Sequence, residues 1–140
     1  MTSSNAIIPF VGTWNLMSQY TYRPDNSATP SRGENPAGIL MYDAAGNMAV
    51  QLMRTDELAE QFINLADLTT ALDGYLAYFG HYEVDEAQGL VLHHVTGASY
   101  PGYRGTIQTR QYEFTQDRLI LKAVAPDGVS LRVLIWQHIG

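Results

Sequence analysis

The chain has 140 residues, 46% of them hydrophobic, which is enough for one domain with a single core. The formal net charge of −6 argues against binding to a phosphate backbone, and the lack of cysteine excludes disulfides, thiol catalysis and cysteine zinc sites. No apolar run approaches the ~20 residues that cross a bilayer, and residues 1–11 lack a signal-peptide pattern, so we expect a cytoplasmic protein that binds neither membrane nor nucleic acid.

Short segments of alternating apolar and polar residues dominate the chain, separated by turns rich in Gly, Pro, Asn and Asp. This pattern is typical of antiparallel strands joined by hairpins, and about eight such strands are enough to close a small barrel. The predicted strands are Gly12–Tyr22, Gly38–Tyr42, Asn47–Met53, Tyr75–Asp85, Leu90–Thr96, Gly105–Phe114, Arg118–Val124 and Val129–His138.

Two longer connections interrupt the hairpins. Tyr22–Pro36 combines several prolines with polar residues, which predicts a loop without strands that covers one end of the barrel. Thr55–Asp73 carries Leu58, Phe62 and Leu65 on one helical face. This spacing predicts a short helical lid between the third and fourth strands.

The strand Gly105–Phe114 carries the most informative residues. Burying Tyr112 and Phe114 also turns Gln108 and Arg110 inward, because side-chain direction alternates along a strand. A buried guanidinium is costly unless it is paired, and the inward rows offer no clear carboxylate. Arg110 is therefore either a structural brace, held by hydroxyls, carbonyls or an acid at the rim, or a clamp for an oxygen of a bound molecule.

The same alternation assigns inner faces on other strands. Glu83 and Asp85 favour water, so Tyr82 points inward, and Tyr78 does too unless a bulge occurs at Gly80. The first strand places one row on a common face, consisting of Trp14, Leu16, Ser18, Tyr20 and Tyr22.

Two adjacent histidines, His93 and His94, face opposite ways in a strand, so they cannot share a metal ion. Both faces of this strand carry apolar residues, and the flanking Val91 and Val95 favour His93 as the inner one. His93 is then either a satisfied core histidine or a general acid or base. We expect His81 and His94 outside, and neither a metal nor a cofactor.

Several stretches resemble one protein family. Gly12-Thr13-Trp14 resembles the Gly-x-Trp element that opens the first strand of lipocalins and related calycin barrels. The stretches Gly38–Arg54, Gly74–Asp85 and His93–Phe114 are similar to the bacterial and fungal lipocalin-like domain family. The resemblance implies a barrel that binds a small apolar molecule. It also implies a floor closed by Trp14 packed on an arginine of the last strand, here Arg132.

We therefore expect an all-β fold, a single eight-stranded antiparallel lipocalin-like barrel over residues 1–140. The alternative is an α+β cone of the kind used by small cyclases, against which the lack of an N-terminal helical pattern argues. Some lipocalin-like barrels act as cofactor-free cyclases and isomerases in natural-product pathways. The resemblance does not imply a single activity, because other members are stand-alone proteins of unknown role, and it transfers no residue roles.

We predict that the cup binds one small, largely apolar or amphipathic oxygenated molecule and promotes a cofactor-free cyclisation or isomerisation. The alternatives are a non-catalytic carrier or sensor and an interaction module whose barrel is filled by side chains. A homodimer formed through outward apolar residues also stays open. The predicted catalytic residues are Arg110, His93, Tyr82 and Tyr112, and the predicted ligand-binding residues are Tyr20, Tyr78, Gln108, Phe114, Leu16 and Trp136.

Overall fold

The computed structural model describes residues 4–56 and 74–140. The predicted helical lid Thr55–Asp73 lies almost entirely outside the described residues. The predicted strand ends differ from the observed ones by at most two residues. The elements are α1 (Ser4–Ile7), β1 (Gly12–Tyr22), β2 (Ala28–Pro30), β3 (Ala37–Tyr42), β4 (Asn47–Met53), β5 (Tyr75–Asp85), β6 (Leu90–Ala98), the 3₁₀ turn η2 (Pro101–Tyr103), β7 (Ile107–Thr115), β8 (Arg118–Val124) and β9 (Leu131–His138).

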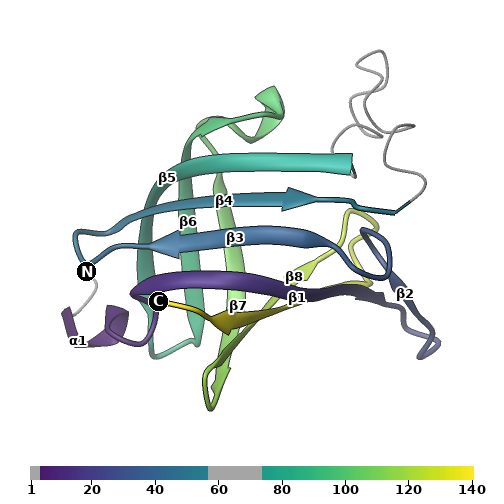
Figure 1. Cartoon of the computed structure of the whole chain (residues 1–140), viewed down its shortest axis with the longest axis horizontal. Coiled ribbons are helices and arrows are strands. Elements are labelled where there is room, and N and C mark those ends of the chain that lie inside the picture. Colours follow the sequence, from purple (N-terminus) through teal and green to yellow (C-terminus); the bar gives the residue numbers. More distant parts are fainter. Residues whose placement is uncertain (1–3, 57–73) are drawn as a thin grey trace.

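Eight antiparallel strands form a closed barrel (Figure 1). The sheet runs in the order β2-β1-β3-β4-β5-β6-β7-β8-β9, and pairing of β1 with β9 closes it. The order follows the chain from β3 onward because short turns place consecutive antiparallel strands side by side. The prediction of a strand-free connection over Tyr22–Pro36 was wrong. Within it, β2 adds three residues to the edge of β1 by pairing with Tyr20–Tyr22.

The two ends of the barrel differ in what closes them. One end, termed the floor, holds α1 and the C-terminus (Figure 1) together with the turns after β3, β5 and β7. Gly12 pairs with Tyr42 near this end. The opposite end, termed the mouth, receives the connections that leave β1, β6 and β8, and Ala37 pairs with Met53 there.

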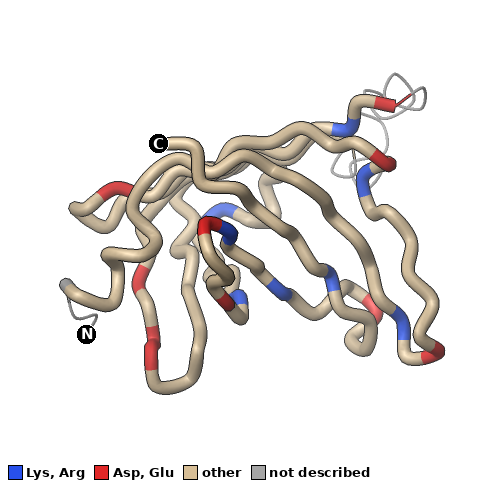
Figure 2. The backbone as a smooth tube through the Cα atoms, turned by 60° about the horizontal axis from the view of Figure 1, so that its bottom comes forward, with Lys and Arg blue, Asp and Glu red and all other residues tan. Residues whose placement is uncertain are grey.

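Charged residues do not gather on one face of the described chain. Figure 2 shows acidic positions at several turns and basic positions spread singly over strands and loops. Of the helices in this part of the chain, none has the length and apolar character of a membrane-spanning helix.

Alternating burial along the strands builds the core inside the barrel. In β4, Met48, Val50 and Leu52 are buried while their neighbours are exposed. The row continues across β5, where Tyr78 keeps its inward direction because the register shift falls on the β6 side. Gly80 permits this close pairing, since a Cβ there would lie 1.9 Å from the His94 carbonyl oxygen.

A bulge in β1 reverses the inward row that the sequence predicts for this strand. The register with β9 shifts between Leu16 and Ser18, so the inward direction passes from Leu16 to Gln19. Gln19 is 3% exposed. Tyr20 and Tyr22 consequently share the other face, with ring centroids 6.4 Å apart. The predicted inward direction of Tyr20 was therefore wrong, because one extra residue changes every later direction.

The predicted brace between Trp14 and Arg132 was also wrong. Trp14 pairs with His138 at the floor, whereas Arg132 pairs with Thr21 near the mouth. The two side chains therefore belong to opposite ends of the barrel. Trp14 instead packs against the His138 ring at a centroid distance of 4.8 Å and against Phe114 at 6.1 Å.

Candidate functional site

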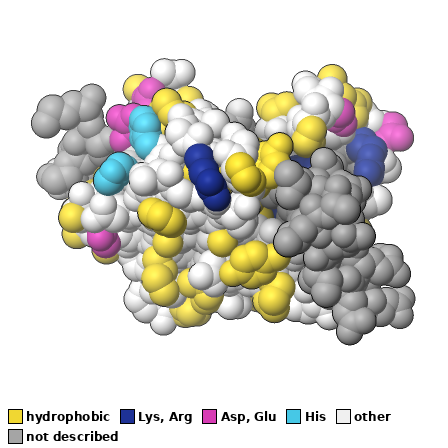
Figure 3. All heavy atoms as spheres, turned by 90° about the horizontal axis from the view of Figure 1, so that it is seen from above, with side chains coloured by type: hydrophobic (Ala, Val, Ile, Leu, Met, Phe, Trp, Pro, Cys, Tyr) yellow, Lys and Arg dark blue, Asp and Glu magenta, His cyan; other side chains and the backbone are white. Residues whose placement is uncertain are grey.

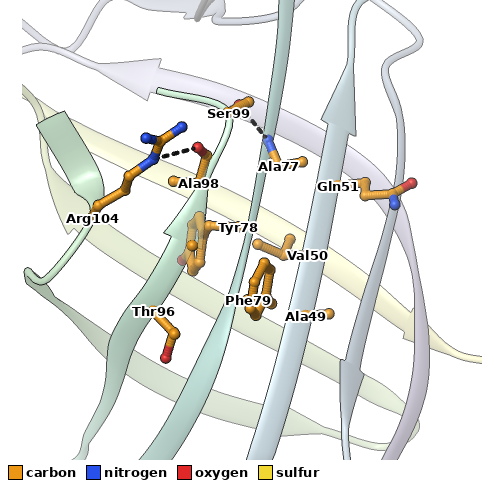
Figure 4. A pocket seen from close by; sticks show the side chains of 11 residues that line it. Ala49, Val50, Gln51, Ala77, Tyr78, Phe79, Thr96, Ala98, Ser99 and Arg104 are labelled. Atoms are coloured by element: carbon orange, nitrogen blue, oxygen red, sulfur yellow. Dashed lines mark hydrogen bonds between the residues drawn. The ribbon is translucent and has the colours of Figure 1, made fainter. Parts of the chain in front are cut away.

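A groove of about 470 Å³ crosses the outside of β4, β5 and β6. Exposed residues such as Ala49, Gln51 and Phe79 line it, as Figure 4 shows. The charged side chain in its lining, Arg104, donates from Nε to the Ala98 carbonyl oxygen at 3.2 Å. The groove thus offers mainly apolar surface, and the hydroxyl of its buried Tyr78 binds His93 inside the barrel.

Exposed hydrophobic side chains also appear on the face in Figure 3. Large exposed apolar residues on outward positions include Met41, Phe79 and Ile107, each about half exposed. Single exposed apolar residues are ordinary on protein surfaces. The homodimer stays a prediction, and the barrel interior is the better candidate for a site.

The interior cavity lies in the middle and mouth of the barrel. Its volume is about 60 Å³, below the roughly 300–1,000 Å³ of typical small-molecule pockets, so a larger ligand enters only when side chains at the mouth move. The lining combines aliphatic walls with several polar groups. It consists of Gln19, Arg32, Leu40, Val50, Leu52, Leu76, Tyr78, His93, Tyr103, Arg110, Leu121, Ala123, Arg132, Leu134 and Trp136.

His93 lies between two tyrosine hydroxyls in this interior. Its Nε2 is 2.6 Å from the Tyr42 hydroxyl and its Nδ1 is 2.6 Å from the Tyr78 hydroxyl. The histidine is 2% exposed, which confirms it as the inner member of the pair. His94 lies outside, where its Nε2 contacts the Glu83 carboxylate at 2.6 Å. Both ring nitrogens of His93 are therefore occupied by protein groups.

Each ring nitrogen of His93 shares a hydrogen bond with one tyrosine hydroxyl. A neutral imidazole has one N–H, so one of these nitrogens donates and the other accepts. Tyr42 is 2% exposed, and His93 is the partner of its hydroxyl. Tyr78 also lines the cavity, so its hydroxyl lies where a bound molecule can contact it.

Burial fixes the protonation states of these three groups. Desolvation lowers the pKa of His93 to about 3, with a further contribution from the Arg110 charge, so the imidazole is neutral. Desolvation raises the pKa of Tyr42 well above its usual value and also raises that of Tyr78. Arg110 opposes the change at Tyr78 by its charge and by a side-chain hydrogen bond. Both phenols therefore stay protonated near neutral pH.

Arg110 lines the cavity next to Tyr78, and β7 alternates as the sequence predicts. Its Nη1 donates to the Thr109 carbonyl oxygen at 3.0 Å. None of the described carboxylates lines the cavity. A guanidinium and a phenol O–H thus meet in one enclosed space, where donors stabilise negative charge on an oxygen better than they do in water.

Two further arginines line the mouth side of the cavity, and the sequence did not single them out as ligands of a bound molecule. Arg32 comes from the connection after β2, is 3% exposed and donates from Nε to the Gln19 side-chain oxygen at 3.1 Å. Arg132 comes from β9. Strand alternation was the signal that could have found Gln19 and Arg132. The β1 bulge hid it for Gln19, and the predicted brace with Trp14 hid it for Arg132.

Four of the predicted site residues lie apart from the cavity lining, and three of them are at the floor. Phe10 packs against Tyr82, Tyr112 and Phe114 at centroid distances of 6.3, 4.9 and 4.9 Å. Desolvation raises the pKa of Tyr82 to about 12, and its hydroxyl donates to the Asp43 carbonyl oxygen at 2.8 Å. The fourth, Leu16, is buried in the core and outside the cavity lining.

The remaining predictions divide between the cavity and other positions. Arg110, His93, Tyr78 and Trp136 line the cavity together. Gln108 does not line it, and its amide donates to the Thr106 hydroxyl at 2.9 Å. Tyr20 lies on the other face of β1 because of the bulge described above. The cavity thus brings four of the predicted residues together.

Comparison with known families agrees with this barrel. A family model described as a lipocalin-like domain matches residues 11–139. The chain belongs to the lipocalin-like family. For this lipocalin-like domain the comparison with curated proteins found no match. Among solved structures, a chain described as a de novo designed fluorescence-activating beta barrel shares 12% identity, with a TM-score of 0.49, over 99% of this chain and 100% of that one.

The described side chains around the cavity supply hydrogen-bond donors and apolar walls. Family membership supports binding of a small molecule in general. Within residues 4–56 and 74–140, no three or more metal-ligating side chains lie together. The cavity offers guanidinium and phenol donors, an indole and aliphatic walls. These groups can bind and polarise an oxygen atom.

Proposed function

We propose that the barrel binds one small, largely apolar oxygenated molecule and promotes its cofactor-free cyclisation or isomerisation in a natural-product pathway. The observation that carries the proposal is the placement of Arg110 beside Tyr78 in a cavity lined by none of the described carboxylates. Donors fixed in an enclosed site stabilise an oxygen as negative charge develops on it.

Each residue has a separate role in this proposal. Arg110 and the Tyr78 hydroxyl donate to the same ligand oxygen, while the aliphatic walls hold the carbon skeleton in a reactive conformation. His93 is a positioning residue, because both of its nitrogens bind tyrosine hydroxyls and its Nδ1 holds the Tyr78 hydroxyl in place. An isomerisation of this type moves a proton or closes a ring without adding or removing atoms, so it needs no co-reactant.

The test compares Arg110→Met with Arg118→Met. Arg118 is exposed and donates to the Gln137 side chain, so the control removes the same charge away from the cavity. A compound that co-purifies with the protein from its own host is incubated with each variant, and chromatography separates isomers of equal mass. We expect Arg110→Met to lose conversion or binding and Arg118→Met to keep both. Unchanged conversion by folded Arg110→Met contradicts the proposal.

A non-catalytic carrier is the second candidate, and one observation favours it. The cavity offers donors, but its histidine has a pKa of about 3 and both nitrogens engaged, so the lining provides no free imidazole base. A carrier releases its compound unchanged. Recovery of the same isomer after prolonged incubation, with binding still lost in Arg110→Met, identifies a carrier.

A further inference from the structure

Arg110 and Arg132 occupy one row across the inside of the barrel. Ala123 of β8 pairs with Arg132 of β9. Arg110 lies one position beyond the Gln111–Lys122 pair, which places it beside Ala123 on the other side. The two arginines are thus two strands apart, about 10 Å at the backbone. Because Ala123 between them carries only a methyl group, the two long side chains have room to approach each other above it.

Polar atoms at this place lack partners within the described chain. The Nε of Arg132 and the indole Nε1 of Trp136 are both buried, and neither donates to an acceptor among the described residues. Trp136 is 1% exposed, and both residues line the cavity. A buried donor without an acceptor destabilises the folded chain, and more strongly when it is charged. A ligand that brings an acceptor atom can therefore satisfy these donors.

The sign of the charge points to an anion. Arg110 and Arg132 both line the cavity, and no described carboxylate lies in its lining. Two like charges in one enclosed space repel each other, and this repulsion is stronger than it is in water. A bound anion between them removes the repulsion and accepts hydrogen bonds from both guanidinium groups. Arg32 is already engaged by Gln19 and is not required.

We propose that the ligand of this barrel carries a carboxylate group, bound between Arg110 and Arg132. The inference rests on the proposed function and names the chemical class of its ligand. The planar fork of a guanidinium matches the two oxygens of a carboxylate, which favours parallel hydrogen bonds. The aliphatic walls formed by residues such as Leu40, Val50 and Leu134 then enclose the apolar body.

A carboxylate suits the cavity better than a phosphate. A phosphate monoester brings up to two negative charges and three oxygens that need donors. Most of the residues around the two arginines are aliphatic, and the space is about 60 Å³. One flat, singly charged group places fewer unsatisfied oxygens against these walls.

The experiment measures binding of decanoic acid and 1-decanol to the full chain by calorimetry at pH 7. The probes share an apolar tail and differ in the charged head. Arg132→Met is the test variant and Arg118→Met, outside the cavity, is the matched control. Tryptophan fluorescence gives a second readout, since Trp136 lines the cavity. We expect decanoate to bind the native chain more tightly than decanol. Arg132→Met should weaken decanoate about ten- to a hundredfold and change decanol less than about threefold.

The outcomes separate this inference from the proposed function. Equal binding of acid and alcohol, or unchanged decanoate affinity in folded Arg132→Met, overturns the carboxylate site and leaves binding of a neutral oxygenated molecule intact. Equal weakening in Arg132→Met and Arg118→Met assigns the effect to net charge and also overturns the site. Failure of both probes to bind the native chain contradicts this inference and the proposed binding together.

Discussion

The Trp14 indole Nε1 donates a hydrogen bond of 2.9 Å to the Phe10 carbonyl oxygen, which ties the segment before β1 to the floor. Phe10 is 0% exposed, and its ring packs edge-on against the Tyr42 ring at a centroid distance of 5.4 Å. The floor is therefore an aromatic plug supplied by the N-terminal segment.

Phe10→Ala should lower the free energy of unfolding by about 3–5 kcal/mol, because it removes a fully buried ring from a packed aromatic cluster. Urea denaturation at pH 7 measures the loss. Ile8→Ala is the control, since Ile8 lies in the same segment and is 64% exposed. It should change the free energy by no more than about 0.5 kcal/mol. Equal small losses in the two variants contradict a floor closed by Phe10.

The buried His93 makes stability depend on pH. Its pKa of about 3 lies below the unfolded value of about 6.5, so between these values the unfolded chain binds a proton that the folded chain does not. Stability is therefore full above pH 6.5 and falls toward acid pH by about 1.4 kcal/mol per pH unit from this group. His93→Gln removes the titrating group and should reduce the loss of unfolding free energy between pH 7 and pH 5.

The measurement compares urea denaturation of native protein, His93→Gln and His81→Gln at both pH values. His81 is exposed on the outside of β5, and His81→Gln leaves the buried imidazole in place. His81→Gln should therefore lose as much free energy of unfolding between pH 7 and pH 5 as the native protein does. The carboxyl groups of Asp43 and Asp127 affect only more acidic solutions, because hydrogen bonds lower their pKa values, that of Asp127 to about 2. If His93→Gln loses as much free energy of unfolding between pH 7 and pH 5 as the native protein, the assignment of His93 as a buried neutral imidazole is wrong.

The two tyrosines that bind His93 should differ in function. Tyr42→Phe and Tyr78→Phe each leave one His93 nitrogen without a partner, so each should lower the free energy of unfolding by about 1–3 kcal/mol. Only Tyr78 lines the cavity. Tyr78→Phe should therefore also weaken binding of an oxygenated ligand about tenfold, whereas Tyr42→Phe changes it little. Calorimetric titration of both variants measures this contrast, and equal affinities contradict a ligand-facing Tyr78 hydroxyl.

The strand pattern was predictable because turn residues and alternation are local properties of the chain. The inner positions of Arg110 and Tyr78 follow from the same alternation, whereas His93 was favoured by its flanking valines because both faces of β6 carry apolar residues. Tyr20 did not follow, since the β1 bulge depends on pairing with β9, which is distant in sequence. A bulge has no reliable local signature, and it changes the direction of every residue after it.

The arginine pair was not predictable for a related reason. Arg132 was assigned to the floor by resemblance, whereas its partner in the register is Thr21 near the mouth. Arg32 reaches the cavity from a connection without regular alternation. Which loop residue enters a barrel is decided by tertiary packing. The sequence therefore indicated one cation in the interior, and the structure places three in the cavity lining.

Removal of Arg132 should leave the fold as stable as before or more stable. Its buried Nε has no partner within residues 4–56 and 74–140, so Arg132→Met removes an unpaired charged donor and keeps an apolar side chain of comparable length. We expect the free energy of unfolding at pH 7 to stay constant or to rise by up to about 2 kcal/mol. Arg54→Met is the matched control, because Arg54 contacts the Asp56 carboxylate at 2.8 Å and is largely buried. The control should lose stability. Urea denaturation measures the free energy of unfolding of both variants. If Arg132→Met loses as much of it as Arg54→Met, Arg132 is a structural brace and the expectation that it serves ligand binding is wrong.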